Sequence, residues 1–249
     1  MLTNKSTYAT RCIWDFGNGI TRETNQDTIH LRYEDYGNFN VTLSVSGITQ
    51  KVIKCTKEIK VWENMSDRLI NPGKPFLRSD TDRKNQTYGD LAGWTVTDNI
   101  KVFKDRTTKK MYGGFLKAYR EPIDGKRCEN LMFVFSKVGL DDAKLYQTVT
   151  LEKGSYRLYI RSLLMKGSND CYFVAAKGNA LPGRDELENP EVLGKKFFNT
   201  LPEADPEILL ELTEKTTITF GLVVNTQTPP KGVTNEVVIE SVGLAGFTK

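Results

Sequence analysis

The stretch LYQTVTLEKGSYRL, residues 145–158, holds two strand patterns on either side of a short polar turn. In the second pattern and its continuation, apolar and polar side chains alternate strictly: Tyr156, Leu158 and Ile160 against Arg157, Tyr159 and Arg161. A period of two residues is typical of a strand that packs one face on a core. Gly154 allows the turn. The residues that we expect in a core between two sheets are Val149, Leu151, Tyr156 and Leu158.

Other parts of the chain show similar strand patterns. Residues 39–46 and 218–224 follow the same alternation, and residues 131–135 and 172–176 are continuous apolar runs. Alternation indicates half-buried strands, and continuous runs indicate strands covered on both faces. The best helical candidate is a short one between Asp185 and Phe198. We therefore predict an all-β fold built from sandwiches.

A domain boundary is readable after Trp62. Strand-like sequence over residues 51–62 gives way to the polar segment 63–67, and prolines follow at Pro72 and Pro75. Proline cannot donate a ladder hydrogen bond, so this segment cannot continue a strand. We predict two domains, residues 1–63 and 64–249.

Composition excludes several classes of partner. The 249 residues carry a net charge of +4 with both signs interspersed, and no basic stripe or reader motif indicates nucleic-acid binding. No apolar run approaches the roughly 18 residues of a membrane helix, so we predict no transmembrane segment in this chain. No signal peptide opens the sequence, and we expect the targeting segment to be absent from this chain.

The four cysteines leave two alternatives open. They form no C-x-x-C pair, and with His30 as the single histidine a zinc site is not expected. An even count permits disulfides in an oxidising compartment, whereas the alternative is small buried thiols on strands. The sequence does not decide the pairing of Cys12, Cys55, Cys128 and Cys171.

Two motifs in order carry a resemblance near the beginning of the chain: WDFGNG at residues 14–19 and YEDYGNFNVTL at residues 33–43. They resemble PKD domains, whose signatures read W-D-F-G-D-G and Y-x-x-x-G-x-Y-x-V-x-L. The resemblance implies a small immunoglobulin-like sandwich that serves as a spacer or interaction module. We expect Trp14 and Phe16 in its core and a tight turn at Gly17-Asn18-Gly19. The chain begins at what resembles the family's second strand, so the first strand is expected to be lacking.

Three stretches further on resemble carbohydrate-binding modules of the galactose-binding-like jelly-roll class. These are residues 69–76 (LINPGKPF) with GWT at 93–95, the central hairpin at 145–158, and the closing strand VIESVGL at 238–244. The resemblance implies a larger jelly-roll β-sandwich whose opening and closing strands lie side by side. Trp94 is expected in its core, with ligand contact as the alternative.

The resemblance also bears on metal binding. Related modules often hold a structural calcium through a carboxylate after the opening phenylalanine and an aspartate in the closing strand. Here Leu77 follows Phe76, and Glu240-Ser241 replaces the aspartate pair. Calcium needs six to eight oxygen ligands. We therefore predict that no cofactor is required. A bound structural calcium remains an alternative, with Glu240 as its candidate ligand.

A sugar site needs exposed aromatic rings beside polar side chains that match hydroxyl groups. The candidates for ligand contact are Arg157, Tyr159, Arg161, Tyr112, Tyr119 with Arg120, Tyr172, and the pair Phe197-Phe198. The alternative for the strand Arg157-Tyr159-Arg161 is that a tyrosine between arginines only covers the sheet surface. Residues 178–200 are long for an irregular connection, which favours a functional loop.

We predict a binding protein and no enzyme. No carboxylate pair lies in a recognisable catalytic motif, and Asp141-Asp142 reads as a turn before a strand. The order of the modules resembles accessory surface glycan-binding lipoproteins of glycan-degrading Gram-negative bacteria. That resemblance implies an extracellular or outer-surface location, an oligosaccharide or polysaccharide ligand, and partner proteins at the cell surface. The alternative is a structural or adhesive protein-interaction module that does not bind sugar.

Overall fold

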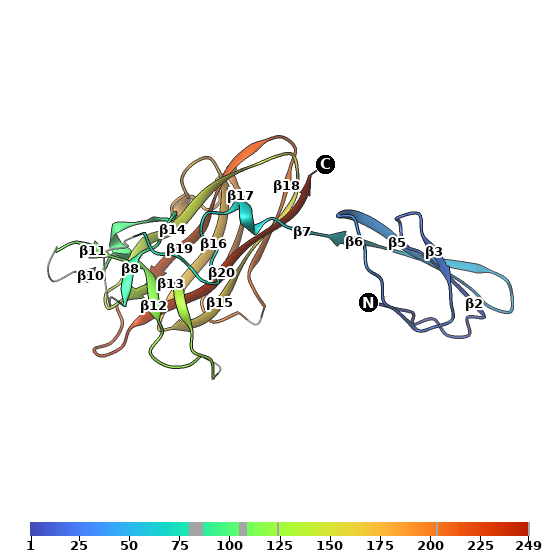
Figure 1. Cartoon of the computed structure of the whole chain (residues 1–249), viewed down its shortest axis with the longest axis horizontal. Helices are drawn as coiled ribbons and strands as arrows, with labels where there is room; N and C mark the ends of the chain where they lie inside the picture. Colours follow the sequence, from blue (N-terminus) through green and yellow to red (C-terminus); the bar gives the residue numbers. More distant parts are fainter. Residues whose placement is uncertain (80–86, 105–108, 124, 203, 249) are drawn as a thin grey trace. The chain divides into compact units, whose positions relative to one another are not determined.

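The computed structural model describes residues 1–79, 87–104, 109–123, 125–202 and 204–248. The chain forms two compact units, Met1–Glu63 and Asn64–Lys249 (Figure 1). In the described parts, regular structure consists of strands and three short 3-10 turns, which confirms the all-β prediction. No helix there is long and apolar enough to cross a membrane.

The first unit is built on one four-stranded sheet in the order β3 (Thr21–Glu23), β2 (Arg11–Asp15), β5 (Gly37–Ser46) and β6 (Val52–Val61). A two-stranded sheet pairs β1 (Leu2–Thr3) with β4 (Thr28–Ile29), so the strand that carries Trp14 is the second in the structure. Trp14 and Phe16 are buried in the core of this unit. Gly17 has φ +73°, and a Cβ there would lie 2.7 Å from the carbonyl oxygen of Asn40, so the turn requires glycine.

The second unit contains two larger sheets. The first sheet runs β18 (Glu207–Leu212), β15 (Gly154–Lys166), β20 (Asn235–Thr248), β13 (Glu129–Ser136), β12 (Gly114–Ala118) and β8 (Tyr88–Asp90), with β7 (Glu63–Asn64) also paired to β20. The second sheet runs β17 (Val192–Phe198), β16 (Asn169–Lys177), β19 (Thr216–Thr226), β14 (Leu140–Leu151) and β9 (Thr95–Val96). A separate pair joins β10 (Phe103–Lys104) to β11 (Met111–Tyr112).

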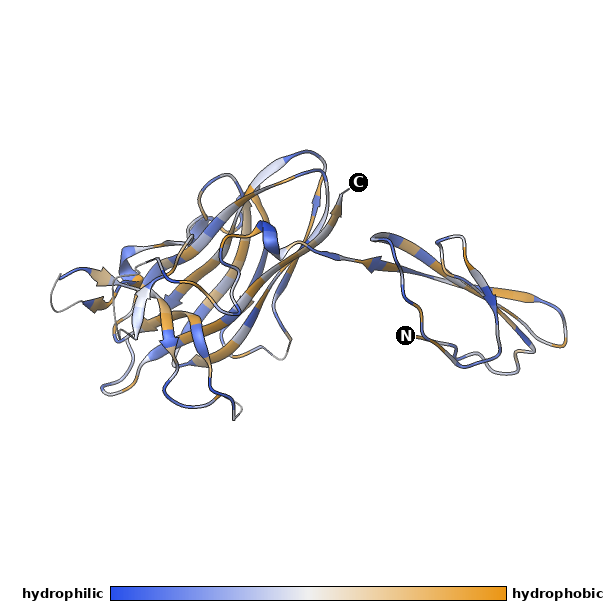
Figure 2. Cartoon of the chain, viewed as in Figure 1, coloured by the Kyte–Doolittle hydropathy of each residue, from blue (hydrophilic) through white to orange (hydrophobic). Residues whose placement is uncertain are grey.

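The core of the second unit lies between these two sheets. Hydrophobic and hydrophilic positions alternate along many of the strands (Figure 2), and residues from both sheets form one buried cluster. Leu151, Tyr156 and Leu158 are fully buried in it, and Val149 packs against it half-buried. Trp94 also belongs to this cluster, and its Nε1 donates to the carbonyl oxygen of Asn71 over 3.0 Å.

The opening and closing segments of the second unit lie side by side. Gly73 forms a bridge with Ser241, and the backbone nitrogen of Val242 donates to the carbonyl oxygen of Pro72 over 2.7 Å.

The three 3-10 turns are η1 (Ser66–Arg68), η2 (Asp98–Ile100) and η3 (Arg184–Glu186).

Two local predictions were wrong. The short helix expected between Asp185 and Phe198 is a single 3-10 turn, η3, followed by the strand β17, because this segment pairs with β16. Asp141-Asp142 does not form a turn before a strand. Both residues lie inside β14, where the ladder with β19 shifts register between Leu140 and Ala143.

All four cysteines are free, and Cys12 and Cys171 are buried.

Candidate ligand-binding site

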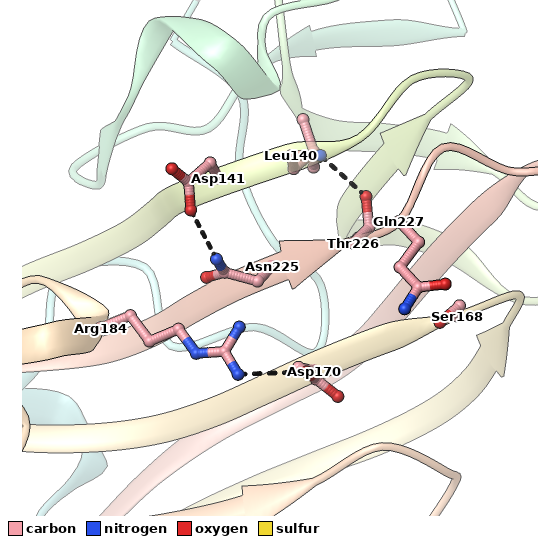
Figure 3. A pocket seen from close by; sticks show the side chains of 8 residues that line it. All are labelled: Leu140, Asp141, Ser168, Asp170, Arg184, Asn225, Thr226 and Gln227. Atoms are coloured by element: carbon pink, nitrogen blue, oxygen red, sulfur yellow. Dashed lines mark hydrogen bonds and ion pairs between the residues drawn. The ribbon is translucent and has the colours of Figure 1, made fainter.

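A polar pocket of about 450 Å³ lies at one end of the five-stranded sheet (Figure 3). All but one of the lining residues are polar, and they come from three strands, the segments beside them and η3: Leu140, Asp141, Ser168, Asp170, Arg184, Asn225, Thr226 and Gln227. Cys171 and Phe173 on β16 belong to the core between the sheets, so the alternate Asp170 and Tyr172 point to the outer face. The pocket therefore lies on the outer face of the sandwich.

Strand register brings the floor of the pocket together. Asp170 on β16 lies opposite Asn225 on β19, and Leu140 on β14 lies opposite Thr226. The register shift after Leu140 is a β-bulge, which turns a side chain away from its regular direction. Asp141 lies in this bulge, and its Oδ1 accepts a hydrogen bond from Asn225 Nδ2 over 2.7 Å.

The loop that precedes β17 supplies the remaining wall. Its residues Leu181 and Leu187 are buried against the outer face of the sheet, which holds η3 in place. The backbone nitrogen of Arg184 donates to Asp142 Oδ1 over 3.0 Å. The Arg184 side chain reaches across the pocket, and its Nη2 lies 3.3 Å from Asp170 Oδ2 (Figure 3). The long segment singled out in the sequence thus contributes a charged side chain to the pocket.

The pocket can hold a ligand rich in hydroxyl groups. Asp141 and Asp170 provide carboxylate acceptors, Arg184 provides planar donors, and Asn225 provides an amide. Hydrogen bonds in which one partner is charged are roughly twice as strong as neutral ones. Two carboxylates against one guanidinium leave the lining with a formal charge of −1, so an anionic ligand would be repelled.

An aromatic pair lies beside the pocket on the same face. Tyr172 on β16 is paired in register with Phe197 on β17, and the two ring centroids are 4.9 Å apart. Tyr172 is half-buried against the cluster beneath the loop, whereas Phe197 is 51% exposed. Tyr172 and Phe197 are thus predicted ligand-contact residues that the structure places on the pocket's face.

The structure places the predicted strand Arg157-Tyr159-Arg161 on the outer face of the other sheet. The Arg157 guanidinium lies 5.3 Å from the centre of the Tyr159 ring, and its Nε lies 2.6 Å from Glu207 Oε2. The ring also lies against Gly243, its cross-strand neighbour on β20, where a Cβ would come within 2.0 Å of Tyr159 Cζ. Tyr159 is half-buried, and Arg157 and Gly243 both lie against its ring.

Two other predicted tyrosines have different surroundings from those expected. Tyr112 on β11 is buried, with 3% of its surface exposed; it lies opposite Phe103 on β10, and Lys110 Nζ lies 4.9 Å from the centre of its ring. It therefore lacks the exposed face that ligand contact requires. Tyr119 donates to Glu236 Oε2 over 2.6 Å, and burial together with this bond raises its pKa. The Tyr119 hydroxyl group is thus already hydrogen-bonded within the protein.

Glu240, the candidate calcium ligand, is engaged by cations. Its Oε2 lies 3.0 Å from Arg161 Nε and 3.2 Å from Lys74 Nζ. Within the described ranges, no group of three or more His, Cys, Asp or Glu side chains is arranged to hold a metal ion. In the structure Glu240 belongs to an ion-pair network with Arg161 and Lys74.

Sequence reasoning missed Asp141, Asp170, Arg184 and Asn225 as a group. Their positions in the chain are far apart, and three strands and a loop must fold before they meet. Two signals were present. Asp141-Asp142 stands next to a strong strand pattern, and the long segment 178–200 contains Arg184. Neither signal indicates which residues it will face.

Comparison with solved structures found β-sandwich proteins at low identity. One, from work on the promiscuous specificity of carbohydrate-binding modules of the β-sandwich superfamily, is 18% identical with a TM-score of 0.35, covering 95% of this chain and 85% of that chain. Another, TmCBM61 in complex with β-1,4-galactotriose, is 13% identical with a TM-score of 0.41, covering 64% and 91%. A third, CBM51-2 with GlcNAc and INT domains from Clostridium perfringens ZmpB, is 10% identical with a TM-score of 0.30, covering 84% and 37%.

The comparisons of sequence divide the chain as its fold does. A comparison with curated proteins found no match. Residues 2–49 match the PKD domain, which confirms the resemblance read from WDFGNG. Residues 70–221, more than half of the chain, match the family described as Domain of unknown function (DUF5013). By this match the chain belongs to the DUF5013 family, with a PKD domain ahead of the family's own region.

Proposed function

We propose that this protein is a non-catalytic glycan-binding protein, in which the polar pocket of the second unit binds sugar and the PKD unit is a spacer. The observation that carries the proposal is the convergence of Asp141, Asp170 and Arg184 beside the Tyr172–Phe197 pair. Sugar hydroxyls require directional acceptors and donors, and sugar C–H faces pack on aromatic rings. Both kinds of surface lie on one outer face of the sandwich.

The partners of the carboxylates support binding over catalysis. Glycoside hydrolysis requires one carboxyl group that donates a proton and one that acts as nucleophile or base. In the pocket, Asp141 accepts from the Asn225 amide, and Asp170 is paired with the Arg184 guanidinium. Each carboxylate is thus held as an acceptor, which suits the recognition of hydroxyl groups.

The proposal includes a location outside the cell or on its outer surface, as a secreted protein or a lipoprotein. The PKD match over residues 2–49 supports it, because such domains are typical of extracellular proteins. Oligosaccharides or polysaccharides are then the ligands, and partner proteins at the surface are compatible with the spacer role.

The test is a binding screen of the full chain against neutral and acidic glycans, with and without calcium, followed by calorimetry. Asp170→Asn should raise the Kd of a bound neutral glycan about tenfold or more, since a charge-assisted hydrogen bond contributes about 1.5–3 kcal/mol. Glu207→Gln is the matched control, because it changes a carboxylate paired with an arginine on the outer face of the other sheet. Equal effects of both variants, or no binding by the folded wild type, would refute the proposal.

A structural or adhesive role through protein contacts is the second candidate, and one feature favours it. β6 is the edge strand of the first unit's sheet, and Val52 and Ile53 on it are 56% and 61% exposed. Exposed edge strands can pair with another chain. If no glycan binds, sedimentation of the wild type and of Ile53→Lys would test this role. Self-association that the variant abolishes would support it.

A further inference from the structure

Phe197 is an exposed aromatic side chain whose place beside the pocket calls for an explanation. It is 51% exposed, and it contacts Tyr172 with the ring planes at 48°. Tyr172 follows Asp170 by two residues on the outer face of β16, a rise of about 7 Å along the strand. The aromatic pair therefore lies about one sugar unit away from the carboxylate that pairs with Arg184.

The pocket itself lacks an aromatic surface. Its single apolar lining residue is Leu140, which is buried with 4% exposure. A sugar unit in the pocket can thus satisfy its hydroxyl groups but gains little contact for its C–H face. Phe197 offers the complementary surface, because a phenyl ring has no hydrogen-bonding group. The pocket supplies hydrogen-bonding groups for one sugar unit, and the Tyr172–Phe197 pair supplies an aromatic surface for the next unit of the chain.

We propose that the site extends from the pocket to the Tyr172–Phe197 pair and that its ligand is an oligosaccharide of at least two units. One unit occupies the pocket and hydrogen-bonds to Asp170 and Arg184, and the next places its C–H face on Phe197 (Figure 3 shows the pocket part). Tyr172 packs against the Phe197 ring from the neighbouring strand and is itself held against the buried cluster. This inference rests on the proposed function of the pocket.

The experiment measures how affinity depends on chain length. Mono-, di- and trisaccharides of glucose, galactose, mannose and N-acetylglucosamine are titrated into the full chain by calorimetry. The wild type should bind the preferred disaccharide about tenfold more tightly than its monosaccharide, the gain expected from one aromatic contact. Phe197→Ala should remove that gain for the disaccharide, whereas Phe197→Tyr should retain it.

Leu209→Ala is the matched control, because Leu209 is 54% exposed on β18 of the other sheet. Its affinities should equal those of the wild type. A wild type that binds monosaccharide and disaccharide equally well would overturn the extended site and leave the pocket proposal intact. Equal weakening of both ligands by Phe197→Ala would also overturn it, since the ring would then contact the sugar unit that occupies the pocket. No binding of any saccharide would refute the proposed function itself.

Discussion

Arg184 Nη2 lies 3.3 Å from Asp170 Oδ2, although one residue stands on a loop and the other on a central strand of the sheet. The loop is held to the sheet by the buried Leu181 and Leu187, so the contact depends on packing as well as on charge. Both side chains are about 40% exposed or slightly more, and an ion pair of that kind contributes little to stability. Its role is then to orient the two groups toward the pocket.

Arg184→Ala should weaken glycan binding by about tenfold while changing the free energy of unfolding by less than about 1 kcal/mol. The variant removes the planar donors and leaves Asp170 without its guanidinium partner. Arg184→Lys should recover only part of the affinity, since an ammonium group cannot reproduce the planar fork. Calorimetry and urea denaturation separate the two effects. Unfolding of the loop, detected as a large loss of stability, would contradict the prediction.

Gly243→Ala should destabilise the second unit by about 1–2 kcal/mol, because the new methyl group would displace the Tyr159 ring. In a Tyr159→Ala background the same change should cost almost nothing. A double-mutant cycle by urea denaturation measures the coupling. Tyr159→Ala by itself should leave glycan affinity within about twofold of the wild type, and a larger loss would return the binding site to the other sheet.

Thiol labelling should distinguish the cysteines by burial. Cys55 is exposed on β6 and should react rapidly with a thiol reagent in the native protein. Cys171 is fully buried, and burial strongly raises the pKa of its thiol, so it should react only after the second unit unfolds. Cys55→Ser should abolish the rapid phase. Rapid labelling of Cys171 in that variant would show that the core around β16 opens readily.

Stability of the second unit should fall as the pH rises above about 10. Burial raises the pKa of Tyr156 above its ordinary 10.0, so the unfolded chain releases its proton first. The stabilising contribution is therefore complete below pH 10 and is lost as the pH rises through the folded-state pKa. Denaturation in urea at neutral pH and at about pH 11 measures this loss.

Tyr156→Phe is the informative variant for that alkaline loss. At neutral pH it should cost about 1 kcal/mol, because Tyr156 Oη donates to the carbonyl oxygen of Glu152 over 2.9 Å. The difference between wild type and variant should shrink above pH 10, since the variant has no proton to lose at this position. An unchanged difference would show that other groups carry the alkaline dependence.

The class of fold and the inward and outward faces of the strands follow from the sequence alone. Tyr156 and Leu158 point inward and Arg157 and Tyr159 outward because a strand repeats every two residues, and this period survives any arrangement of the strands. The turn at Gly17 was equally readable, since its positive φ restricts the residue type to glycine. These features depend on residues that are neighbours in the chain.

Which side chains share a site depends instead on the way the strands and loops pack together. Asp170 meets Asn225 through strand register, Asp141 joins them through a bulge, and Arg184 arrives on a loop anchored by buried leucines. Register also gave Arg157 a carboxylate partner and placed Gly243 against the Tyr159 ring. Contacts between residues far apart in sequence follow from how strands pair and pack, and no local pattern encodes that choice.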